Sequence, residues 1–399
     1  MGLINTKNMR VRLTGKEILC VSSMAYAGMW TRKQRLMTIL AEMGNRVLYV
    51  EPNHPMFARR GQSGSLTEAF TEARKNLFVL RPRGILPLAR FEAIRKANLG
   101  HYIKGVNKTL RRLGFEKPIL FTYLPTIHVH SPFVDILDHL DNSLLVYDCV
   151  DEHSENIGYS PEVAAAVRKC DLDLTTRADL VFVTARGLYD DRKHLNKHLY
   201  LSPNGVDVEH FSKALLDGTE IPSDLAVIPE PRVGFVGALS GWIDFRLIAQ
   251  VARCYPDYQV VLIGPLERGL KPAELADLDN VHFLGKKKLK DLPGYMKGFD
   301  CGINPFRRVG IAERVNPLKV YEYLAAGLPV ISTDMPEVMP LAGIISIGRD
   351  DDEFVQNVGK VVRGEIPRDE AKLQEKLKQH DWDLIFSEVI DRVAAKVQQ

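Results

Sequence analysis

Residues 304–334 read NPFRRVGIAERVNPLKVYEYLAAGLPVISTD, and this stretch predicts a helix that runs directly into a buried strand. Asn316 and Pro317 mark the expected helix start, because an Asn side chain can accept from free backbone amides and Pro suits the first helical position. Gly327 is typical of a helix end, and the apolar run 330–332 predicts a strand. A helix joined to a strand in this way is the repeating unit of an α/β fold with a parallel sheet.

Two charged residues lie near the start of this predicted helix. Lys319 and Glu322 are three positions apart, so their side chains are neighbours on the first two turns. A helix N-terminus offers unpaired amides and a partial positive charge, which favour a phosphate group, and Lys319 adds a full charge there. The Glu322 carboxylate can accept hydrogen bonds from a ribose diol. The alternative interpretation is an ordinary amphipathic helix with an exposed Lys–Glu pair.

The runs Pro317–Lys319 and Glu322–Ile331 resemble the donor-binding helix of glycosyltransferases of the GT-B fold. The resemblance is to glycosyltransferase family four (group 1) and its relatives, including bacterial glucuronosyltransferases of the teichuronic-acid and xanthan type. It implies an α/β fold with two Rossmann-like doubly wound domains, whose parallel sheets face each other across a cleft. The implied activity is transfer of a sugar from a UDP- or GDP-sugar to a lipid-linked saccharide in polysaccharide or cell-envelope glycan assembly.

The resemblance also implies a set of donor-binding residues. In the family, the helix start holds the diphosphate, a glutamate at the position of Glu322 holds the ribose, and an earlier glutamate stands eight residues before it. Here Arg314 occupies that earlier position and Glu313 lies nine residues before, which departs from the family pattern. The family needs no bound metal or cofactor, and none is expected. The expected donor-binding residues are Gly237, Lys286, Arg307, Glu313, Asn316, Lys319 and Glu322.

An acidic cluster follows the predicted strand 144–147. Parallel sheets bind ligands at the carboxyl ends of their strands, which is a suitable place for a general base. By resemblance to the glucuronosyltransferases, Asp151 is the first candidate for the base that deprotonates the acceptor, and Asp148 is the second. The alternative is a helix cap with acids in the first turn. Asp171 and Asp173 fall in a helical pattern and are expected to be solvated.

The composition limits the classes of protein to which the chain can belong. The chain has 399 residues, 45% of them hydrophobic, and a formal net charge of +3, which suits a globular protein of two or three domains and does not indicate a nucleic-acid binder. Its five scattered cysteines favour a reducing compartment. We find no signal-peptide pattern and no apolar run long enough to span a bilayer. The expected location is the cytoplasm, with peripheral contact on the inner face of the cell membrane.

The chain divides by pattern into an N-terminal acceptor domain (1–203), a linker (204–231), a C-terminal nucleotide-sugar-binding domain (232–378) and a final helix (379–399). In the resembling family this final helix crosses back to the first domain. Each of the two predicted domains alternates strands with helices, which predicts parallel sheets.

A predicted helix over 92–113 carries a basic face, formed by Lys104, Lys108, Arg111 and Arg112. One interpretation is a solvated surface; the other is contact with an anionic membrane or with a polyprenyl-diphosphate-linked glycan acceptor, assisted by Arg59 and Arg60. Two other functions remain open at this point. A nucleotide-sugar 2-epimerase shares the fold and acts on the donor alone, and a non-catalytic partner protein would only bind the nucleotide sugar.

Overall fold

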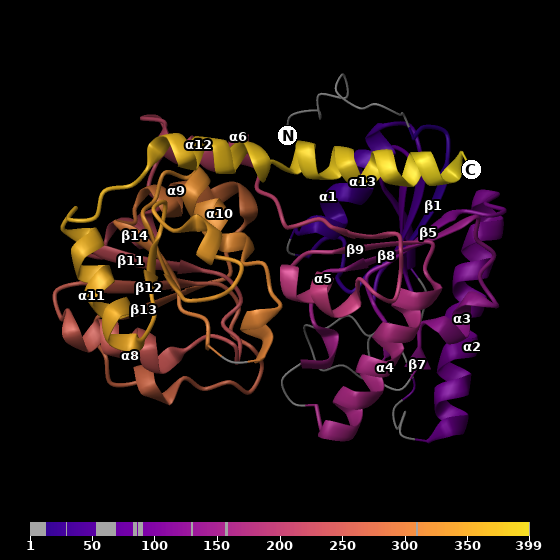
Figure 1. The fold of residues 1–399 in the computed structure, drawn as a ribbon, viewed down its shortest axis with the longest axis horizontal. Coiled ribbons are helices and arrows are strands. Elements are labelled where there is room, and N and C mark those ends of the chain that lie inside the picture. Colours follow the sequence, from indigo (N-terminus) through magenta and orange to yellow (C-terminus); the bar gives the residue numbers. More distant parts are fainter. Residues whose placement is uncertain are drawn as a thin grey trace. The chain divides into compact units, whose positions relative to one another are not determined.

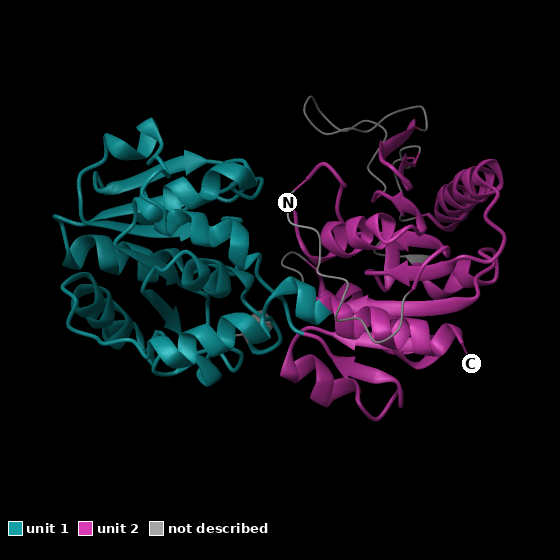
Figure 2. Ribbon diagram, turned by 90° about the horizontal axis from the view of Figure 1, so that it is seen from above, with its two compact units in different colours: residues 1–3, 203–385 teal, residues 4–202, 386–399 magenta. Residues whose placement is uncertain are grey.

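The computed structural model describes residues 13–28, 30–52, 69–82, 86, 91–128, 131–155, 159–308 and 310–398. It divides into two compact units, teal and magenta in Figure 2. The C-terminal unit contains Pro203–Ile385, and the N-terminal unit contains Ile4–Ser202 and Phe386–Gln399. Each unit has a parallel sheet with helices packed on its faces, so the expected α/β class with two Rossmann-like units is confirmed.

The sheet of the C-terminal unit is parallel throughout and has the order β13-β12-β11-β14-β15-β16. The chain therefore builds outward from β11 in one direction, then returns to its other side with β14. Such a reversal is the topological switch point of a doubly wound sheet, where ligands bind beyond the strand ends. The strands are β11 (Arg232–Val236), β12 (Gln259–Ile263), β13 (Val281–Gly285), β14 (Cys301–Asn304), β15 (Val330–Thr333) and β16 (Ser346–Gly348).

Helices cover both faces of this sheet (Figure 1). One apolar cluster joins the strands to α8 (Phe245–Cys254) and α11 (Asp351–Val362). The cluster on the opposite face includes α9 (Leu292–Lys297), α10 (Leu318–Ala325) and α12 (Glu370–Gln379). This second cluster brings α10 under β14 and β15, and that packing fixes the position of the helix discussed below.

The sheet of the N-terminal unit has the order β10-β9-β8-β5-β1-β2-β4-β3, in which β3 pairs antiparallel with β4 and the other pairs are parallel. Its switch point lies between β1 and β5. The strands are β1 (Glu17–Val21), β2 (Arg46–Val50), β3 (Ala69–Arg74), β4 (Leu77–Arg81), β5 (Ile119–Thr122), β8 (Leu144–Cys149), β9 (Leu180–Val183) and β10 (Leu199–Leu201); β6 (Thr126–His128) and β7 (Ser131–Pro132) form a separate pair.

One face of this sheet packs against a group of four helices, and the apolar cluster there contains residues of each. They are α2 (Glu92–Leu113), α3 (Val134–Leu137), α4 (Pro161–Arg177) and α5 (Arg186–Arg192). Figure 1 shows α1 (Arg32–Glu42) and α13 (Trp382–Val397) on the opposite face. The boundary between the units falls within α13, whose residues from Phe386 onward belong to the N-terminal unit.

The segment expected to be a linker, 204–231, differs from that expectation. It forms α6 (Val208–Phe211), the short helix η3 (Ser212–Leu215) and α7 (Ser223–Ala226), and its apolar side chains Phe211 and Leu225 lie in the core of the C-terminal unit. The turn signals in this segment separate short helices rather than domains.

Candidate functional site

Two loops meet at the switch point of the C-terminal sheet, one after β11 and one after β14. The Asp244 amide donates to the Pro305 carbonyl at 2.8 Å, and the Arg307 amide donates to the Trp242 carbonyl at 2.9 Å. Gly237 follows β11 directly and Arg307 lies three residues after β14, so both expected donor-binding residues lie at this edge of the sheet. The edge is where a doubly wound sheet binds ligands.

Glycine is required where the loops after β11 and β12 approach each other. A Cβ on Gly264 would lie 1.7 Å from the Gly237 carbonyl oxygen, and Gly264 has a φ of +150°. The Gly237 amide donates to the Ile263 carbonyl at 2.9 Å, and the Gly264 amide donates to the Gly285 carbonyl at 3.0 Å. These contacts fix the backbone after three neighbouring strands, and Lys286 follows the third of them.

A pocket of about 430 Å³ opens beside these loops. Its wall includes Leu266 and Phe283, which are 45% and 46% exposed, and Lys286 is at its rim. An apolar pocket with an exposed aromatic ring, that of Phe283, and a nearby cation suits a flat heterocycle such as a nucleobase, because stacking on the ring favours it. The lining residues are Leu239, Gly264, Pro265, Leu266, Pro272, Leu275, Ala276, Phe283, Gly285 and Lys286.

The helix α10 packs tightly beneath this edge of the sheet. The Tyr323 hydroxyl accepts a hydrogen bond of 2.6 Å from the Val236 amide in β11. A Cβ on Gly302 in β14 would lie 2.7 Å from the Tyr323 ring, so the glycine permits the close approach of helix and strand. This packing fixes the N-terminus of α10, and with it Lys319 and Glu322.

The prediction that the Asn316 side chain caps α10 is wrong. The helix begins at Leu318 with Pro317 at the capping position, and Pro317 makes no side-chain cap hydrogen bond. The Asn316 amide instead donates to the Glu337 carboxylate at 2.9 Å. Pro317 has ψ near 92°, which is outside the helical region, and this turns the chain so that Asn316 contacts the loop after β15.

Lys319 and Glu322 form a direct ion pair, with 2.6 Å between Nζ and Oε2. Glu322 is 5% exposed, and among the described residues no donor reaches its second oxygen, Oε1. A buried carboxylate with one unused oxygen can accept a hydrogen bond from a ligand hydroxyl. Lys319 holds the other oxygen and keeps a partly exposed ammonium group at the first turn of the helix.

The remaining expected donor-binding residues lie at the surface. Glu313 is exposed, in the short helix η6 (Gly310–Glu313), and pairs with Arg314 at 3.8 Å. Arg307 is exposed, whereas Arg308 pairs with Asp334 at 2.6 Å and also with Asp351. Arg307 is therefore the better placed of the two arginines to contact a ligand phosphate.

Asp148 lies in a buried ion pair in the N-terminal unit. It is the residue before the last one of β8, and both of its carboxylate oxygens accept from Arg32 Nε, at 2.8 and 3.1 Å. Arg32 also donates to the Ser202 hydroxyl at 2.7 Å and lies over the Phe386 ring. An acid with both oxygens committed in this way has a structural role and is a poor general base.

Asp151 follows two residues after β8 and is half-buried. Burial raises the pKa of its carboxyl above the ordinary value, while the nearby charges of Lys33 and then His153 lower it. Burial lowers the pKa of the Lys33 ammonium. A carboxylate with a raised pKa at the carboxyl end of a parallel strand has the properties of a general base.

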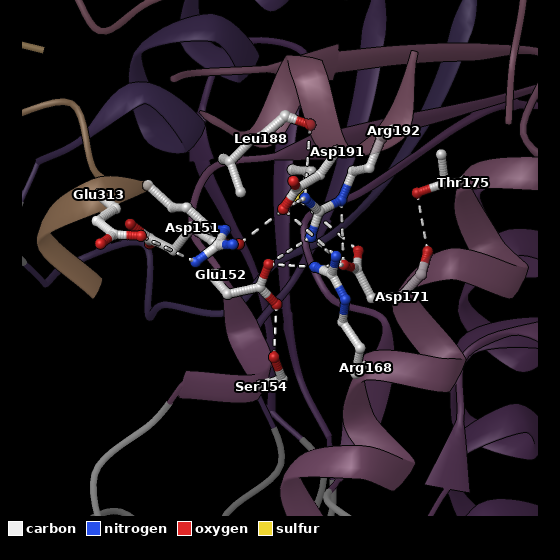
Figure 3. Close-up of polar contacts among 12 residues, drawn as sticks. Asp151, Glu152, Ser154, Arg168, Asp171, Thr175, Leu188, Asp191, Arg192 and Glu313 are labelled. Carbon is white, nitrogen blue, oxygen red and sulfur yellow. Dashed lines mark hydrogen bonds and ion pairs between the residues drawn. The ribbon is translucent and has the colours of Figure 1, made fainter. Parts of the chain in front are cut away.

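Five charged side chains form a network that joins the segment after β8 to α4 and α5 (Figure 3); they are Glu152, Arg168, Asp171, Asp191 and Arg192. Glu152 pairs with Arg192 at 2.8 Å and also with Arg168, and Asp171 pairs with Arg192. Burial raises the pKa of Glu152, but Arg192, Ser154 and Arg168 outweigh burial and hold it at about 2. The network fixes the segment that follows Asp151.

The expectation that Asp171 is solvated is wrong, whereas Asp173 is exposed. Asp171 is fully buried and accepts from the Tyr147 hydroxyl at 2.6 Å. Its position on α4 faces β8 and α5, which supply the hydroxyl and the guanidinium that a buried carboxylate requires.

Sequence reasoning missed Arg32, Lys33 and Arg192, all of which are buried. For Arg32 and Lys33, their position in the helix is a sequence signal that could have indicated burial. They occupy the first turn of α1, where no acidic residue is present and where the helix dipole disfavours cations. Two cations at that position indicate buried acidic partners elsewhere in the fold.

The basic face of α2 is as expected: Lys104, Lys108, Arg111 and Arg112 are exposed. Arg59 and Arg60 lie outside the described residues. Within the described part of the chain, no helix combines the length and apolar composition needed to cross a membrane.

Two comparisons, one with a family model and one with a curated protein, both relate part of the chain to glycosyltransferases. Residues 230–363 match the family model described as glycosyl transferases group 1. A protein of Bacillus subtilis (strain 168), named TuaH and described as a teichuronic acid biosynthesis glycosyltransferase, is 29% identical over 213 residues. That match covers 48% of this chain and 51% of the relative, so the chain aligns with about half the length of this curated relative.

Two solved structures resemble the fold over nearly the whole chain. Sucrose-phosphate synthase from Thermosynechococcus elongatus has a TM-score of 0.70 at 14% identity, covering 94% of this chain and 97% of the other. HepE from Anabaena, in complex with UDP-glucose, has a TM-score of 0.65 at 14% identity, covering 95% and 99%. At this identity the likeness shows the fold alone, and that fold is GT-B, as expected.

Proposed function

We propose, on the premise that this chain is a group 1 glycosyltransferase of the GT-B fold, that it transfers a sugar from a nucleotide-diphosphate sugar to a lipid-linked saccharide. The observation that carries the proposal is the edge of the C-terminal sheet. There a glycine-fixed set of loops, an apolar pocket and the Lys319–Glu322 pair lie in one unit. In this proposal the loops bind the diphosphate, the pocket binds the base, and Lys319 and Glu322 bind the diphosphate and the ribose of one nucleotide sugar.

Each part of the donor has a counterpart in this unit. The pocket beside Lys286 suits the base, and the unused oxygen of Glu322 suits a ribose hydroxyl. Lys319 and Arg307 suit the diphosphate, because cations stabilise phosphate oxygens, and the absence of a side chain at Gly237 lets the ligand approach the backbone there. On binding, one or more N–H groups of the Lys319 ammonium would donate to the ligand instead of to Glu322. HepE, a fold neighbour, binds UDP-glucose, which favours UDP as the nucleotide.

Lys319→Ala and Glu322→Ala are each expected to weaken UDP binding by about 10- to 100-fold. The reason is that each removes a charge-assisted hydrogen bond of roughly 1.5–3 kcal/mol. Calorimetric titration with UDP and with GDP measures the affinity. Lys360→Ala, an exposed lysine in α11, is the matched control and should bind as wild type does. Unchanged affinity in both site variants would place the nucleotide elsewhere.

The acceptor is proposed to bind the N-terminal unit near Asp151. A base there removes the proton from the attacking hydroxyl, while Lys319 and the N-terminus of α10 stabilise the departing nucleoside diphosphate. The name of the Bacillus relative supports an acceptor that belongs to an envelope polysaccharide. Such acceptors carried on a polyprenyl diphosphate present their diphosphate at the membrane surface, where the exposed basic face of α2 would meet it.

Peripheral binding to anionic membranes is the corresponding prediction. Four exposed cations near an anionic surface contribute about 1 kcal/mol each, and the attraction falls off within roughly 8–10 Å. We expect the protein to sediment with anionic liposomes at low salt, to be released at high salt, and to ignore neutral liposomes. Replacing Lys104, Lys108, Arg111 and Arg112 with Gln should abolish most binding and leave UDP affinity unchanged. A wild-type protein that ignores anionic liposomes would favour a soluble acceptor.

A further inference from the structure

The helix α10 depends on its neighbours for its position. It has only eight residues, and Pro317 at its capping position makes no side-chain hydrogen bond. Isolated helices shorter than about 12–15 residues are marginal in water, so contacts with the rest of the unit must hold α10 in place. Its orientation determines where Lys319 and Glu322 point, and therefore what the proposed nucleotide site can bind.

The two tyrosines of α10 contact different parts of the unit. They are two residues apart, which is about 200° around a helix, so they point to nearly opposite sides. Tyr323 is held by the Val236 amide of β11 and packs on Gly302 of β14. Tyr321 is 3% exposed and stacks on the ring of His380, at the end of α12, with 4.1 Å between ring centroids and 18° between ring planes. The helix is therefore held on two sides, by the sheet and by His380.

The His380 ring is itself fixed in orientation. Its Nδ1 donates to the Lys376 carbonyl, one turn earlier in α12, at 2.9 Å. Burial lowers the pKa of the ring, so the ring is neutral at neutral pH. It meets Tyr321 as one aromatic face against another, a contact that favours a definite geometry.

The backbone at His380 pairs with a segment from the start of the same unit. The Val206 amide donates to the His380 carbonyl at 2.7 Å, and the Trp382 amide donates to the Val206 carbonyl at 3.2 Å. A Cβ on Gly205 would lie 2.8 Å from the His380 carbonyl oxygen, so a glycine permits this close approach. The position of His380 is thus set by backbone contacts as well as by α12.

The same segment makes a second contact with α10. The Asn204 side-chain amide donates to the Asn316 carbonyl, just before the helix begins, at 3.0 Å. Asn316 precedes Lys319 in the sequence, and Tyr321 lies between Lys319 and Glu322. The paired backbone therefore contacts α10 on both sides of Lys319.

We infer that His380 is a positioning residue for nucleotide binding: its ring holds Tyr321, and with it the turn of α10 that carries Lys319 and Glu322. The inference rests on the proposed function, in which those two side chains bind the diphosphate and the ribose. His380 acts on the ligand only through α10. Removing the ring leaves the sheet contacts of α10 intact and opens a gap beside Tyr321, into which the helix can shift.

The first test is UDP calorimetry on His380→Ala and His380→Phe. His380→Ala is expected to weaken UDP binding by about 3- to 10-fold, because a stacked aromatic pair contributes up to roughly a tenfold factor. His380→Phe keeps a ring against Tyr321 and should bind as the wild type does. Tyr258→Ala is the matched control. It removes a ring from the stacked pair of Tyr255 and Tyr258, which lies in the same unit against the apolar cluster on the opposite face of the sheet, and should leave UDP affinity unchanged.

The outcomes separate this inference from the proposed function. If the wild type binds UDP and His380→Ala binds it equally well, the inference is overturned and the nucleotide site stands. Equal weakening in His380→Ala and Tyr258→Ala would show a general effect of lost stability, and would overturn the inference too. A wild type that binds neither UDP nor GDP would overturn the proposed function, and the inference with it.

Hydrogen exchange of the wild-type protein tests the same coupling without a variant. Coupling between two sites is reciprocal, so bound UDP should in turn slow exchange of the Val206 and Trp382 amides, whose hydrogen bonds hold the backbone at His380. The Tyr258 amide, which donates to the Tyr255 carbonyl, is the control and should exchange at an unchanged rate. Unchanged exchange at Val206 and Trp382 in the presence of saturating UDP would contradict the inference.

Discussion

Asp151→Asn is expected to lower the turnover of sugar transfer by about 10²- to 10⁴-fold, the usual contribution of a general base. The amide keeps the size of the side chain but cannot take the acceptor proton. Nucleotide affinity should stay at the wild-type value, because the proposed donor-binding residues belong to the C-terminal unit. Steady-state kinetics and UDP calorimetry on the same preparation measure both effects.

Asp148→Asn is the matched comparison, since the two acids are three residues apart. Asp148 is held by Arg32, so its replacement should lower the free energy of unfolding more than Asp151→Asn does. If Asp151→Asn turned over at the wild-type rate while folded Asp148→Asn did not, the base would be Asp148. If neither change affected turnover, the acids would serve only the structure.

Asp171→Ala is expected to lower the free energy of unfolding by about 3–5 kcal/mol, because it leaves the buried guanidinium of Arg192 short of one anionic partner. Asp171 also accepts from the Tyr147 hydroxyl, which would lose its partner. Urea denaturation measures the change. Asp173→Ala, two residues further along α4 and exposed, should stay within about 0.5 kcal/mol of wild type.

The same network gives a pH dependence. The pKa of Glu152 is about 2 in the folded protein, below its ordinary value of 4.5. Because the pKa of Glu152 is depressed by folding, its carboxylate stabilises the folded state at pH values above 4.5, and this stabilisation is lost as the pH falls from 4.5 toward 2.

The mutant comparison has its own contradicting outcome. Equal losses of stability in Asp171→Ala and Asp173→Ala would show that the network contributes little.

Elements with local signals could be predicted from the sequence. The structure has α2 over Glu92–Leu113, matching the expected 92–113, because its apolar stripe ends at Gly114, which adopts the left-handed conformation. The capping box of Thr31 and Gln34, a pattern that can be recognised in the sequence, begins α1. The edge strand β3 was not predicted, because its sequence is polar and largely exposed and only its pairing with β4 makes it a strand.

The candidate site likewise contains some residues that local patterns reveal and others that only the tertiary fold brings together. Lys319 and Glu322 could be recognised because helical spacing alone makes them neighbours. The local pattern predicts Asn316 as the cap, but its partner Glu337 lies on another loop that no local pattern reveals. The pairing of Arg32 with Asp148 joins residues 116 positions apart, and the burial of Asp171 depends on Arg192 from α5. Such contacts follow from the sheet order, which local periodicity does not determine.

The central claim is that this protein transfers a sugar from a nucleotide-diphosphate sugar to an acceptor. Its most direct test is release of nucleoside diphosphate from UDP- and GDP-sugars, with and without a polyprenyl-diphosphate-linked saccharide. The account predicts release that depends on the acceptor and appears together with a glycosylated lipid. Epimerisation of the sugar at C2 without acceptor would identify an epimerase instead. Nucleotide-sugar binding with neither product would contradict transfer and leave a binding protein.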